Sequence, residues 1–464
     1  NNKAYAGNFA DNLYESIPDK QIIAFFKRSF GTQEPVYFDD SKNPWFSEAI
    51  ASLILKKVKN DAELYLPDGY KNAVITVPAQ YNDVQRKSVI EAAKLADLEI
   101  SAIIEEPVAA ALYYGSFNKK IDDEIILVYD FGGGTFDLTL ITKSGNQLNV
   151  IAIDGVANLG GKEFDEIVKN TIYETFEKLF KAPFPTDKLT ANRIAKIAES
   201  IKIELNDAEL PKNIHKWLMV GREAFETTFL YPIYAAKANE LIAKTDNAVS
   251  RCLRSLGMQF TDIHKVVLIG GTSSSKLVYN YWSKKMAPHQ ELIYHQPLNS
   301  VAKGAALYAA SFGDGIGNAV QAIDLKSVST YNIGLQLQTR GGGTQPIDLL
   351  IHRNTPLPVS AKKVYKINTS QNDSFEVQLC QFWDQKEDVQ YMGTIKAGSL
   401  SMYNELYIEV QAENRLNGTI GIKLKNAENG KDIKFEFLKK PSNYKYDFKQ
   451  QKSLVDSVYL NNII

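Results

Sequence analysis

Three consecutive glycines stand between two acidic side chains in VYDFGGGTFDLTLI, residues 128–141. A backbone without Cβ atoms can bring several N–H groups close to one anion, such as a phosphate. Asp130 and Asp137 would repel a bare phosphate. They fit a site in which Mg²⁺ lies between carboxylates and phosphate oxygens and keeps several of its waters. The residue types therefore predict a magnesium and phosphate site, with a purely structural hairpin as the alternative.

The glycines, Gly132, Gly133 and Gly134, interrupt two apolar runs that read as strands, so we expect them at a hairpin tip. Thr135 adds a hydroxyl that can hold a phosphate oxygen or a water. No helix is expected directly after the glycines. The pattern is therefore neither a P-loop nor a dinucleotide-binding fingerprint.

Two glycine pairs each precede a predicted helix: Gly160 with Gly161, and Gly270 with Gly271. A helix N-terminus preceded by glycine can bind an anion through its free N–H groups. Either pair alone is explained better by a tight turn between strand and helix. Together with the first glycine run, the two pairs favour a nucleotide site built from three loops.

Composition excludes some classes of partner. The chain has 464 residues, 44% of them hydrophobic and 23% charged, with 53 basic against 54 acidic side chains. A net charge near zero argues against binding to nucleic acid or to an anionic membrane surface. No apolar run approaches the roughly 20 residues of a membrane helix, and no signal peptide is recognised. Cys252 and Cys380 are too far apart in sequence for a metal-binding cluster, and a reducing, cytoplasmic location is expected.

The hydrophobic pattern changes along the chain. Helical and strand periods alternate up to about residue 310, which predicts an α/β domain. From SFEVQLCQ to DIKFEF, apolar residues occupy every second position, and Asn417-Gly418 and Asn429-Gly430 mark turns, as in an antiparallel sandwich. We expect an α/β domain over residues 1–314, a linker over 315–330, a β-sandwich over 331–440 and a short tail over 441–464, with room for one helix.

These motifs resemble those of a known family. The segment AVITVPAQYNDVQRKSVIEAAKLADLEISAIIEEPVAAALYYG, residues 73–115, together with DFGGGTFD, NLGGKEFD and LIGGTSS, resembles the actin-like ATPase superfamily and, within it, the seventy-kilodalton heat-shock chaperones of the DnaK type. The resemblance covers about residues 4–440. It implies an actin-like (ribonuclease H-like), two-lobed α/β ATPase domain, followed by an all-β sandwich that binds peptides.

The resemblance assigns roles to individual residues. Lys27 would orient the attacking water and touch the γ-phosphate, and Glu106 and Asp130 would hold Mg²⁺ through waters. Asp130, Thr135 and Asp137 match the metal, cation and phosphate contacts, which implies ATP or ADP, Mg²⁺ and K⁺ as ligands. The adenosine side would be formed by Glu199, Lys202, Asn206 and the position of Ser274. Pro78 and Arg86 would couple the two domains, and the peptide groove would be lined by Leu335, Tyr365, Phe375, Val377 and Leu379.

The chain also departs from the family pattern. The family's first phosphate loop and its C-terminal helical lid have no counterpart in the sequence, so we expect a truncated chain with poor hydrolysis. Ser274 replaces an arginine that stacks on adenine, and Leu298 replaces an aspartate nearby. Ala102 replaces a basic residue used for J-domain proteins, and the segment NDAELPKNIHKWLMVGREAFETTF is shorter than the family's outer-lobe hairpins. Stimulation by J-domain proteins and nucleotide exchange factors is therefore a doubtful expectation.

The expected function is that of a heat-shock-type chaperone, in which ATP binding and hydrolysis control the binding of extended hydrophobic polypeptides. Two alternatives remain open. A degenerate homologue would bind a partner without turnover, and a small-molecule kinase of the same superfamily would transfer phosphate to a metabolite.

Overall fold

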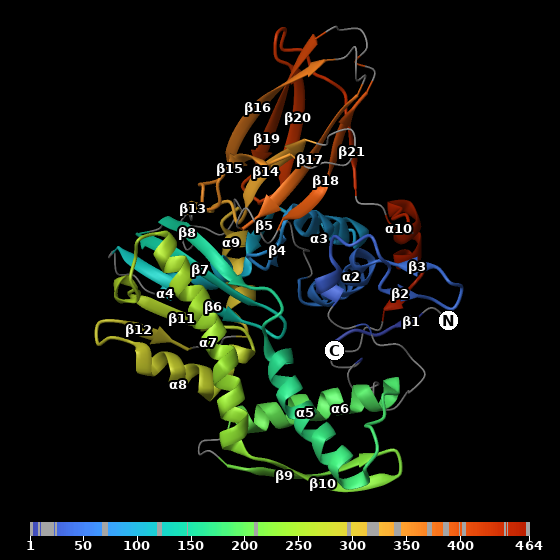
Figure 1. Cartoon of the computed structure of the whole chain (residues 1–464), viewed down its shortest axis with the longest axis vertical. Helices are drawn as coiled ribbons and strands as arrows, with labels where there is room; N and C mark the ends of the chain where they lie inside the picture. Colours follow the sequence, from blue (N-terminus) through green and yellow to red (C-terminus); the bar gives the residue numbers. More distant parts are fainter. Residues whose placement is uncertain are drawn as a thin grey trace.

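The structure is a computed structural model. It describes residues 3–7, 10, 23, 26–66, 73–117, 123–145, 147–207, 212–294, 298–312, 324–337, 345–368, 374–383, 389–398, 400, 405–439, 442 and 444–460. Figure 1 shows an α/β part at the bottom and a group of long strands standing on top of it. Most of the predicted linker, up to residue 323, lies outside the described residues.

A mixed six-stranded sheet forms the centre of the α/β part. Its order is β12 (Glu291–Ile293), β11 (Lys265–Ile269), β6 (Glu124–Phe131), β7 (Phe136–Ser144), β8 (Gln147–Val156) and β13 (Asp324–Lys326). Successive side chains of β6 point to opposite faces, so Leu127 joins one hydrophobic core and Ile126 the other. The sheet is thus buried on both sides.

Helices cover both faces of this sheet. One face packs against α4 (Glu106–Phe117) and α9 (Ser300–Ala310). The other packs against a layer that we call the lower lobe: α5 (Gly161–Phe180), α6 (Lys188–Asp207), β9 (Ile214–Val220), β10 (Glu223–Phe229), α7 (Tyr231–Ser255), η2 (Phe260–Asp262), η3 (Thr272–Ser274) and α8 (Lys276–Lys285). The predicted α/β class is confirmed.

A smaller unit, the N-terminal lobe, precedes the sheet. It contains η1 (Phe26–Ser29), β2 (Tyr37–Phe38), β3 (Pro44–Trp45), α2 (Ser47–Tyr65), β4 (Val74–Val77), α3 (Asp83–Leu95) and β5 (Ala102–Glu105). The start of α3 is fixed by a capping box, in which the Asn82 side chain accepts from the Gln85 N–H and the Gln85 side chain accepts in return. Helix α3 therefore begins at a defined residue, directly below the strands of the upper part (Figure 1).

The upper part is a β-sandwich. One sheet has the order β15 (Asp348–Ile351), β14 (Asn332–Leu337), β17 (Phe375–Phe382), β18 (Gln390–Ala397) and β21 (Glu436–Leu438). The other has the order β16 (Val359–Asn368), β19 (Glu405–Asn414) and β20 (Ile420–Asn426). A single hydrophobic cluster fills the space between them. Gly418 and Gly430 both take positive φ in the turns where the Asn-Gly pairs predicted them.

The buried face expected from the alternation of Ile433, Phe435 and Phe437 is confirmed only in part, because Ile433 and Phe435 pack against the sandwich core and Phe437 does not. Only residues Glu436–Leu438 pair with the sheet, as an edge strand, and the Phe437 side chain is 37% exposed. A Cβ on Gly393 would stand 2.5 Å from the nearest carbon atom of the Phe437 ring, which is too close. Phe437 thus covers a glycine on the outside of the sheet instead of entering the core.

The C-terminal segment returns to the N-terminal lobe. Helix α10 (Phe448–Asp456) packs on α2 and α3, and β22 (Tyr459–Leu460) pairs in parallel with β1 (Lys3–Ala4). Figure 1 shows α10 beside the N-terminal lobe and not over the sandwich. The described tail contains one helix, which agrees with the prediction that it has room for no more than one.

Candidate functional site

The three predicted glycine sites meet at the tip of the β6–β7 hairpin. The Gly132 N–H donates to the Thr135 carbonyl over 3.1 Å, which closes the tip. The first turn of α5 lies against it, since the Lys162 N–H donates to the Gly133 carbonyl over 2.9 Å. A Cβ on Gly160 would stand 2.5 Å from the Gly133 backbone. Glycine at position 160 is therefore required by close packing of two backbones.

The third glycine pair reaches the same place from β11. Gly270 has φ +86°, which favours glycine, and a Cβ there would stand 2.7 Å from an Asp130 carboxylate oxygen. In the next turn, the Thr272 hydroxyl donates to the Gly132 carbonyl over 2.7 Å. Three loops that are distant in sequence thus meet at the hairpin tip, with Gly270 against Asp130.

Charged side chains from several elements collect beside the hairpin tip. Lys27 on η1 forms an ion pair with Glu106 at the start of α4, with 3.6 Å between Nζ and Oε1. The neighbouring Arg28 donates to the Gly134 carbonyl over 2.8 Å, which holds η1 against the glycines. Asp130 is the last but one residue of β6, Asp137 is the second residue of β7, and the two are in register with each other. The five residues assigned to catalysis thus lie on η1, α4 and the β6–β7 hairpin.

The carboxylates disturb one another's ionisation. Burial raises the pKa of Asp130 well above its usual range, and the charges of Glu106 and Asp137 raise it further, against the opposing effect of Lys27. Burial and the charge of Glu106 raise the pKa of Asp137 to about 7, despite hydrogen bonds from Thr135 and Gln80. Each negative charge is therefore costly here without a compensating cation.

This donor set fits a divalent cation held through water. The repulsion among the carboxylates is what a dication would relieve. No three acidic, histidine or cysteine side chains within the described ranges are placed to hold a metal ion together. Carboxylate oxygens that contact the ion through its bound waters suit Mg²⁺, because Mg²⁺ gives up its waters reluctantly.

The adenosine-side candidates are partly engaged with the protein. On α6, Lys202 pairs with Asp165 at 2.9 Å, and the Asn206 side chain accepts from the Tyr234 hydroxyl over 3.2 Å. Glu199 is exposed, and the Ser274 carbonyl accepts from the Tyr294 hydroxyl over 3.0 Å. Lys202 lies close to the glycines, 3.3 Å from where a Cβ on Gly161 would be.

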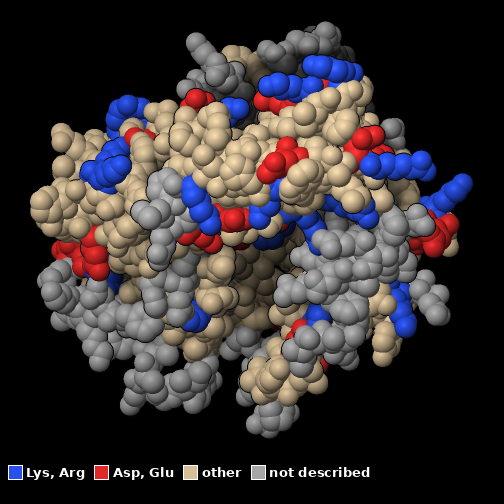
Figure 2. Space-filling model, turned by 90° about the horizontal axis from the view of Figure 1, so that it is seen from below, with Lys and Arg blue, Asp and Glu red and all other residues tan. Residues whose placement is uncertain are grey.

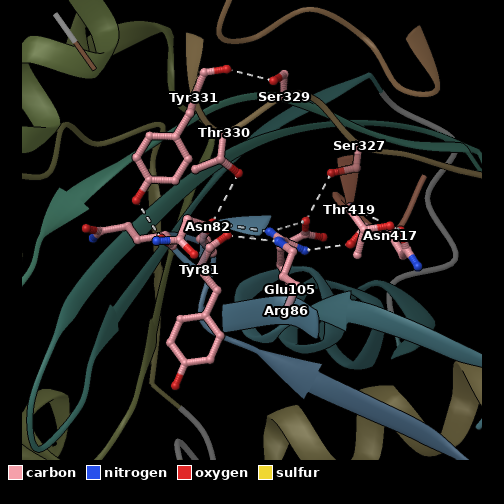
Figure 3. Close-up of polar contacts among 12 residues, drawn as sticks. Tyr81, Asn82, Arg86, Glu105, Ser327, Ser329, Thr330, Tyr331, Asn417 and Thr419 are labelled. Carbon is pink, nitrogen blue, oxygen red and sulfur yellow. Dashed lines mark hydrogen bonds and ion pairs between the residues drawn. The ribbon is translucent and has the colours of Figure 1, made fainter. Parts of the chain in front are cut away.

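Arg86 lies at the junction with the sandwich (Figure 3), and Pro78 lies in the turn that precedes α3. Arg86 is 1% exposed and donates to the Glu105 carboxylate over 3.1 Å and to the Asn417 carbonyl over 3.2 Å. The Pro78 carbonyl accepts from the Tyr81 N–H over 3.1 Å, which shapes the turn into α3. Arg86 thus joins the N-terminal lobe to the β19–β20 turn of the sandwich.

Gln80 connects the acidic cluster with the sandwich. Its N–H donates to the Asp137 carboxylate over 3.2 Å, and its carbonyl accepts from the Tyr331 hydroxyl over 2.6 Å. Next to it, the Thr330 hydroxyl donates to the Ala79 carbonyl over 3.1 Å (Figure 3). Sequence reasoning missed Gln80 because its backbone makes both links, and no side-chain type signals that.

Asp83 is a second contact that the sequence reading missed. It is 1% exposed, and its carboxylate accepts from the Ile420 N–H over 2.7 Å. Its own N–H donates to the Gln381 side chain over 2.9 Å. An acidic residue in the first turn of a helix normally complements the helix dipole in solvent, so its type hid its partners.

The proposed peptide-groove residues lie together but inside the sandwich. Leu335, Tyr365, Phe375, Val377 and Leu379 are all at most 6% exposed and belong to one core cluster. The Tyr365 and Phe375 rings are 5.7 Å apart, and the Tyr365 hydroxyl donates to Asp348 over 2.9 Å. Segments 338–344 and 369–373, next to β14 and β16, lie outside the described residues. Within the described part, these side chains are core.

Comparison with known proteins decides the family. The sequence profile of the family described as Hsp70 protein matches residues 27–437. The chain belongs to the Hsp70 family. It is 32% identical over 373 residues to the Chaperone protein DnaK of Thermosipho melanesiensis, which covers 77% of this chain and 59% of that protein. The Chaperone protein DnaK of Thermotoga petrophila is 32% identical over 375 residues, covering 78% and 59% of the two chains. This Hsp70-family chain thus spans about three fifths of the length of these relatives.

The match defines which features this Hsp70-family chain shares. Every candidate site residue, from Lys27 to Leu379, lies inside the matched range. Helix α10 and both strands of the β1–β22 pair lie outside it. The described tail is therefore not explained by the family match.

The surface shows no field of one sign on the face in Figure 2, where basic and acidic side chains are interspersed. This agrees with the balance of 53 basic and 54 acidic residues. Over the described ranges, no helix has the length and apolar character needed to cross a membrane.

Proposed function

We propose that the protein is a heat-shock-type chaperone that binds and hydrolyses ATP between the lobes of an actin-like domain and controls extended hydrophobic polypeptides through its sandwich. The observation that carries this proposal is the gathering of Lys27, Glu106, Asp130 and Asp137 around one glycine hairpin. Phosphoryl transfer requires positioning and charge neutralisation rather than a nucleophilic side chain, and this set supplies both. The names of the relatives support the same activity.

The proposed roles follow from the contacts. Mg²⁺, when bound, would neutralise charge on the phosphates, with Glu106 and Asp130 holding its waters. Lys27, kept near by Glu106, would orient the attacking water. The Thr135 hydroxyl would hold a phosphate oxygen, and the Asp137 carboxylate would hold K⁺. Lys202 and Ser274 would lie on the adenosine side, where the absence of an arginine at position 274 weakens the hold on the base.

We also propose that the sandwich senses the nucleotide through the N-terminal lobe. The Gln80 backbone contacts Asp137 on one side and Tyr331 on the other. A ligand that moves Asp137 would therefore shift the Gln80 backbone, and with it the hydrogen bond from Gln80 to the sandwich. Such coupling requires that the protein make different contacts in two states. We propose that Pro78 and Arg86 transmit the change between the two domains.

The partners in this proposal are unfolded hydrophobic polypeptides, with J-domain proteins and exchange factors as doubtful additions. Burial raises the pKa of both free cysteines, Cys252 and Cys380, to about 12, so both thiols stay protonated and unreactive. Free thiols agree with the reducing conditions of a cytoplasm, where we place the protein.

The test is a single-turnover assay with Mg-ATP on the full chain and on Lys27→Ala, beside calorimetric measurement of nucleotide binding. We expect slow hydrolysis in the parent, a loss of about 100-fold in Lys27→Ala, and little change in affinity. Lys284→Ala, an exposed lysine on α8, is the matched control. Equal rates in the parent and in Lys27→Ala would remove Lys27 from the mechanism.

The same preparation separates the alternatives. Nucleotide binding without turnover would identify a non-hydrolysing binding module. Transfer of labelled phosphate to a sugar would identify a small-molecule kinase. Fluorescence anisotropy of a labelled hydrophobic peptide, with and without ATP, tests the coupling, because a chaperone of this kind should release peptide faster when ATP is present.

A further inference from the structure

The described tail, residues 442 and 444–460, is built into the N-terminal lobe. Val455 is fully buried and Leu460 is 7% exposed, in one cluster with Trp45, Leu53 and Leu95. Removing the tail would uncover this cluster. The segment is therefore part of the lobe's core.

A buried polar side chain fixes the position of α10. Gln451 is 0% exposed; its carbonyl oxygen accepts from the Phe46 N–H over 3.2 Å, and its amide donates to the Pro44 carbonyl over 2.8 Å. It thus bonds to backbone groups at the start of α2 and in β3 at the same time. A nonspecific apolar contact would not need this match.

Polar contacts continue along both ends of the tail. The Ser442 hydroxyl donates to the Gln33 carbonyl over 2.7 Å, where the chain arrives from the sandwich. Lys452 pairs with Asp97 at 2.7 Å, and β22 pairs with β1 at the far end. The tail is therefore anchored from its first described residue to its last.

The connection from the sandwich to this anchor is short. Strand β21 ends at Leu438, and four residues later Ser442 is bonded to the N-terminal lobe. Four residues span at most about 14 Å when fully extended. While the tail is docked, the β18–β21 edge of the sandwich cannot move farther than this from the lobe.

We infer that the described tail, residues 442 and 444–460, is a strap that holds the β-sandwich on the N-terminal lobe, so that the sandwich cannot leave without releasing the tail. A short tether keeps the sandwich at high effective concentration beside its docking contacts, the Asp83–Ile420 and Asp83–Gln381 hydrogen bonds. At its other end the sandwich is joined through β13, which pairs with β8 of the central sheet. The strap acts without nucleotide, so it limits any movement of the sandwich that the proposed ATPase cycle would use.

The test lengthens the tether without disturbing its anchor. A flexible insertion of about 20 Gly and Ser residues after Lys439 lowers the effective concentration on the order of tenfold. The same insertion after Gly221, in the β9–β10 turn at the opposite end of the molecule (Figure 1), is the matched control. Hydrogen exchange of the Ile420 and Asp83 amides reports docking of the sandwich, and exchange of the Phe46 amide reports docking of the tail.

We expect the insertion after Lys439 to speed exchange of the Ile420 and Asp83 amides about tenfold while the Phe46 amide stays protected. The insertion after Gly221 should change none of them. Val455→Asp, with the natural tether, should expose all three amides. Unchanged exchange at Ile420 and Asp83 in both the lengthened and the Val455→Asp proteins would overturn the strap, as would an unprotected Phe46 amide in the parent. All measurements are made without nucleotide, so loss of ATPase activity would leave this result intact.

Discussion

The candidate nucleotide site and the candidate peptide site differ in what the fold does with their side chains. Around Asp130, the fold buries mutually repelling carboxylates, an arrangement that costs stability unless a cation arrives. Around Phe375, it buries apolar side chains against one another, an arrangement that stabilises the sandwich by itself. Electrostatic repulsion that no ligand relieves indicates a binding site, whereas apolar side chains that pack against one another indicate a hydrophobic core. The predictions below test this difference, from the largest effect to the smallest.

Truncating Phe375, which is 3% exposed, should cost the sandwich about 3–5 kcal/mol in free energy of unfolding, as expected for a core aromatic residue. Chemical denaturation of Phe375→Ala measures this cost. Val364→Ala, at a residue 46% exposed on the neighbouring β16, should cost little. A small stability loss combined with lost peptide binding would instead make Phe375 a groove residue.

Neutralising Asp137 should stabilise the ligand-free protein. Its pKa of about 7 in the folded state lies above the usual 3.8, so the folded state binds more protons between these values. Stability therefore falls as pH rises from about 4 to 7, and Asp137→Asn should recover up to about 4 kcal/mol at pH 8. At pH 5 the gain should shrink.

Thermal denaturation at both pH values, with and without Mg-ATP, checks this prediction. Mg-ATP should stabilise the parent and not Asp137→Asn. Asp40→Asn, at an exposed aspartate in the turn between β2 and β3, should behave as the parent does. A variant less stable than the parent at pH 8 would mean that Asp137 is a satisfied structural residue.

Gly160→Ala should separate the hairpin tip from α5. The added Cβ would meet the Gly133 backbone at 2.5 Å, and neither backbone can move without shifting the other loops. We expect a stability loss of about 1–3 kcal/mol and weaker nucleotide binding by calorimetry. Gly133→Ala, where a Cβ would meet no atom within 4 Å, should leave stability unchanged. Equal behaviour of the two variants would contradict the close packing of the two loops.

Removing only the Tyr365 hydroxyl should give the smallest effect. Its hydrogen bond to Asp348, 2.9 Å long, is worth about 1 kcal/mol. Tyr365→Phe should therefore lower the denaturation midpoint slightly and leave the slope of the transition unchanged. No loss at all would show that the hydroxyl is equally well served by solvent, as at the edge of an open groove.

Much of the architecture followed from local pattern. The alternation of Phe375, Val377 and Leu379 predicted a buried strand face, and the glycine run predicted the β6–β7 tip, because both signals lie within a few residues. The pattern failed at Phe437, which lies on an edge strand. Its ring packs over Gly393 of the neighbouring strand and does not enter the core. The two-residue hydrophobic period alone does not show whether a strand will lie at the edge of a sheet or between two other strands.

The sequence by itself determined the family, the order of helices and strands, and the residue types around the glycines, because motif spacing and hydrophobic period are local properties. Only the tertiary structure decided that Gln80 and Asp83 link the lobes to the sandwich, that the groove candidates pack as core, and that the described tail completes the N-terminal lobe. These features depend on contacts between residues that are up to several hundred positions apart. A buried carboxylate and a solvated one, or a core phenylalanine and a groove phenylalanine, are identical in sequence until the fold places their neighbours.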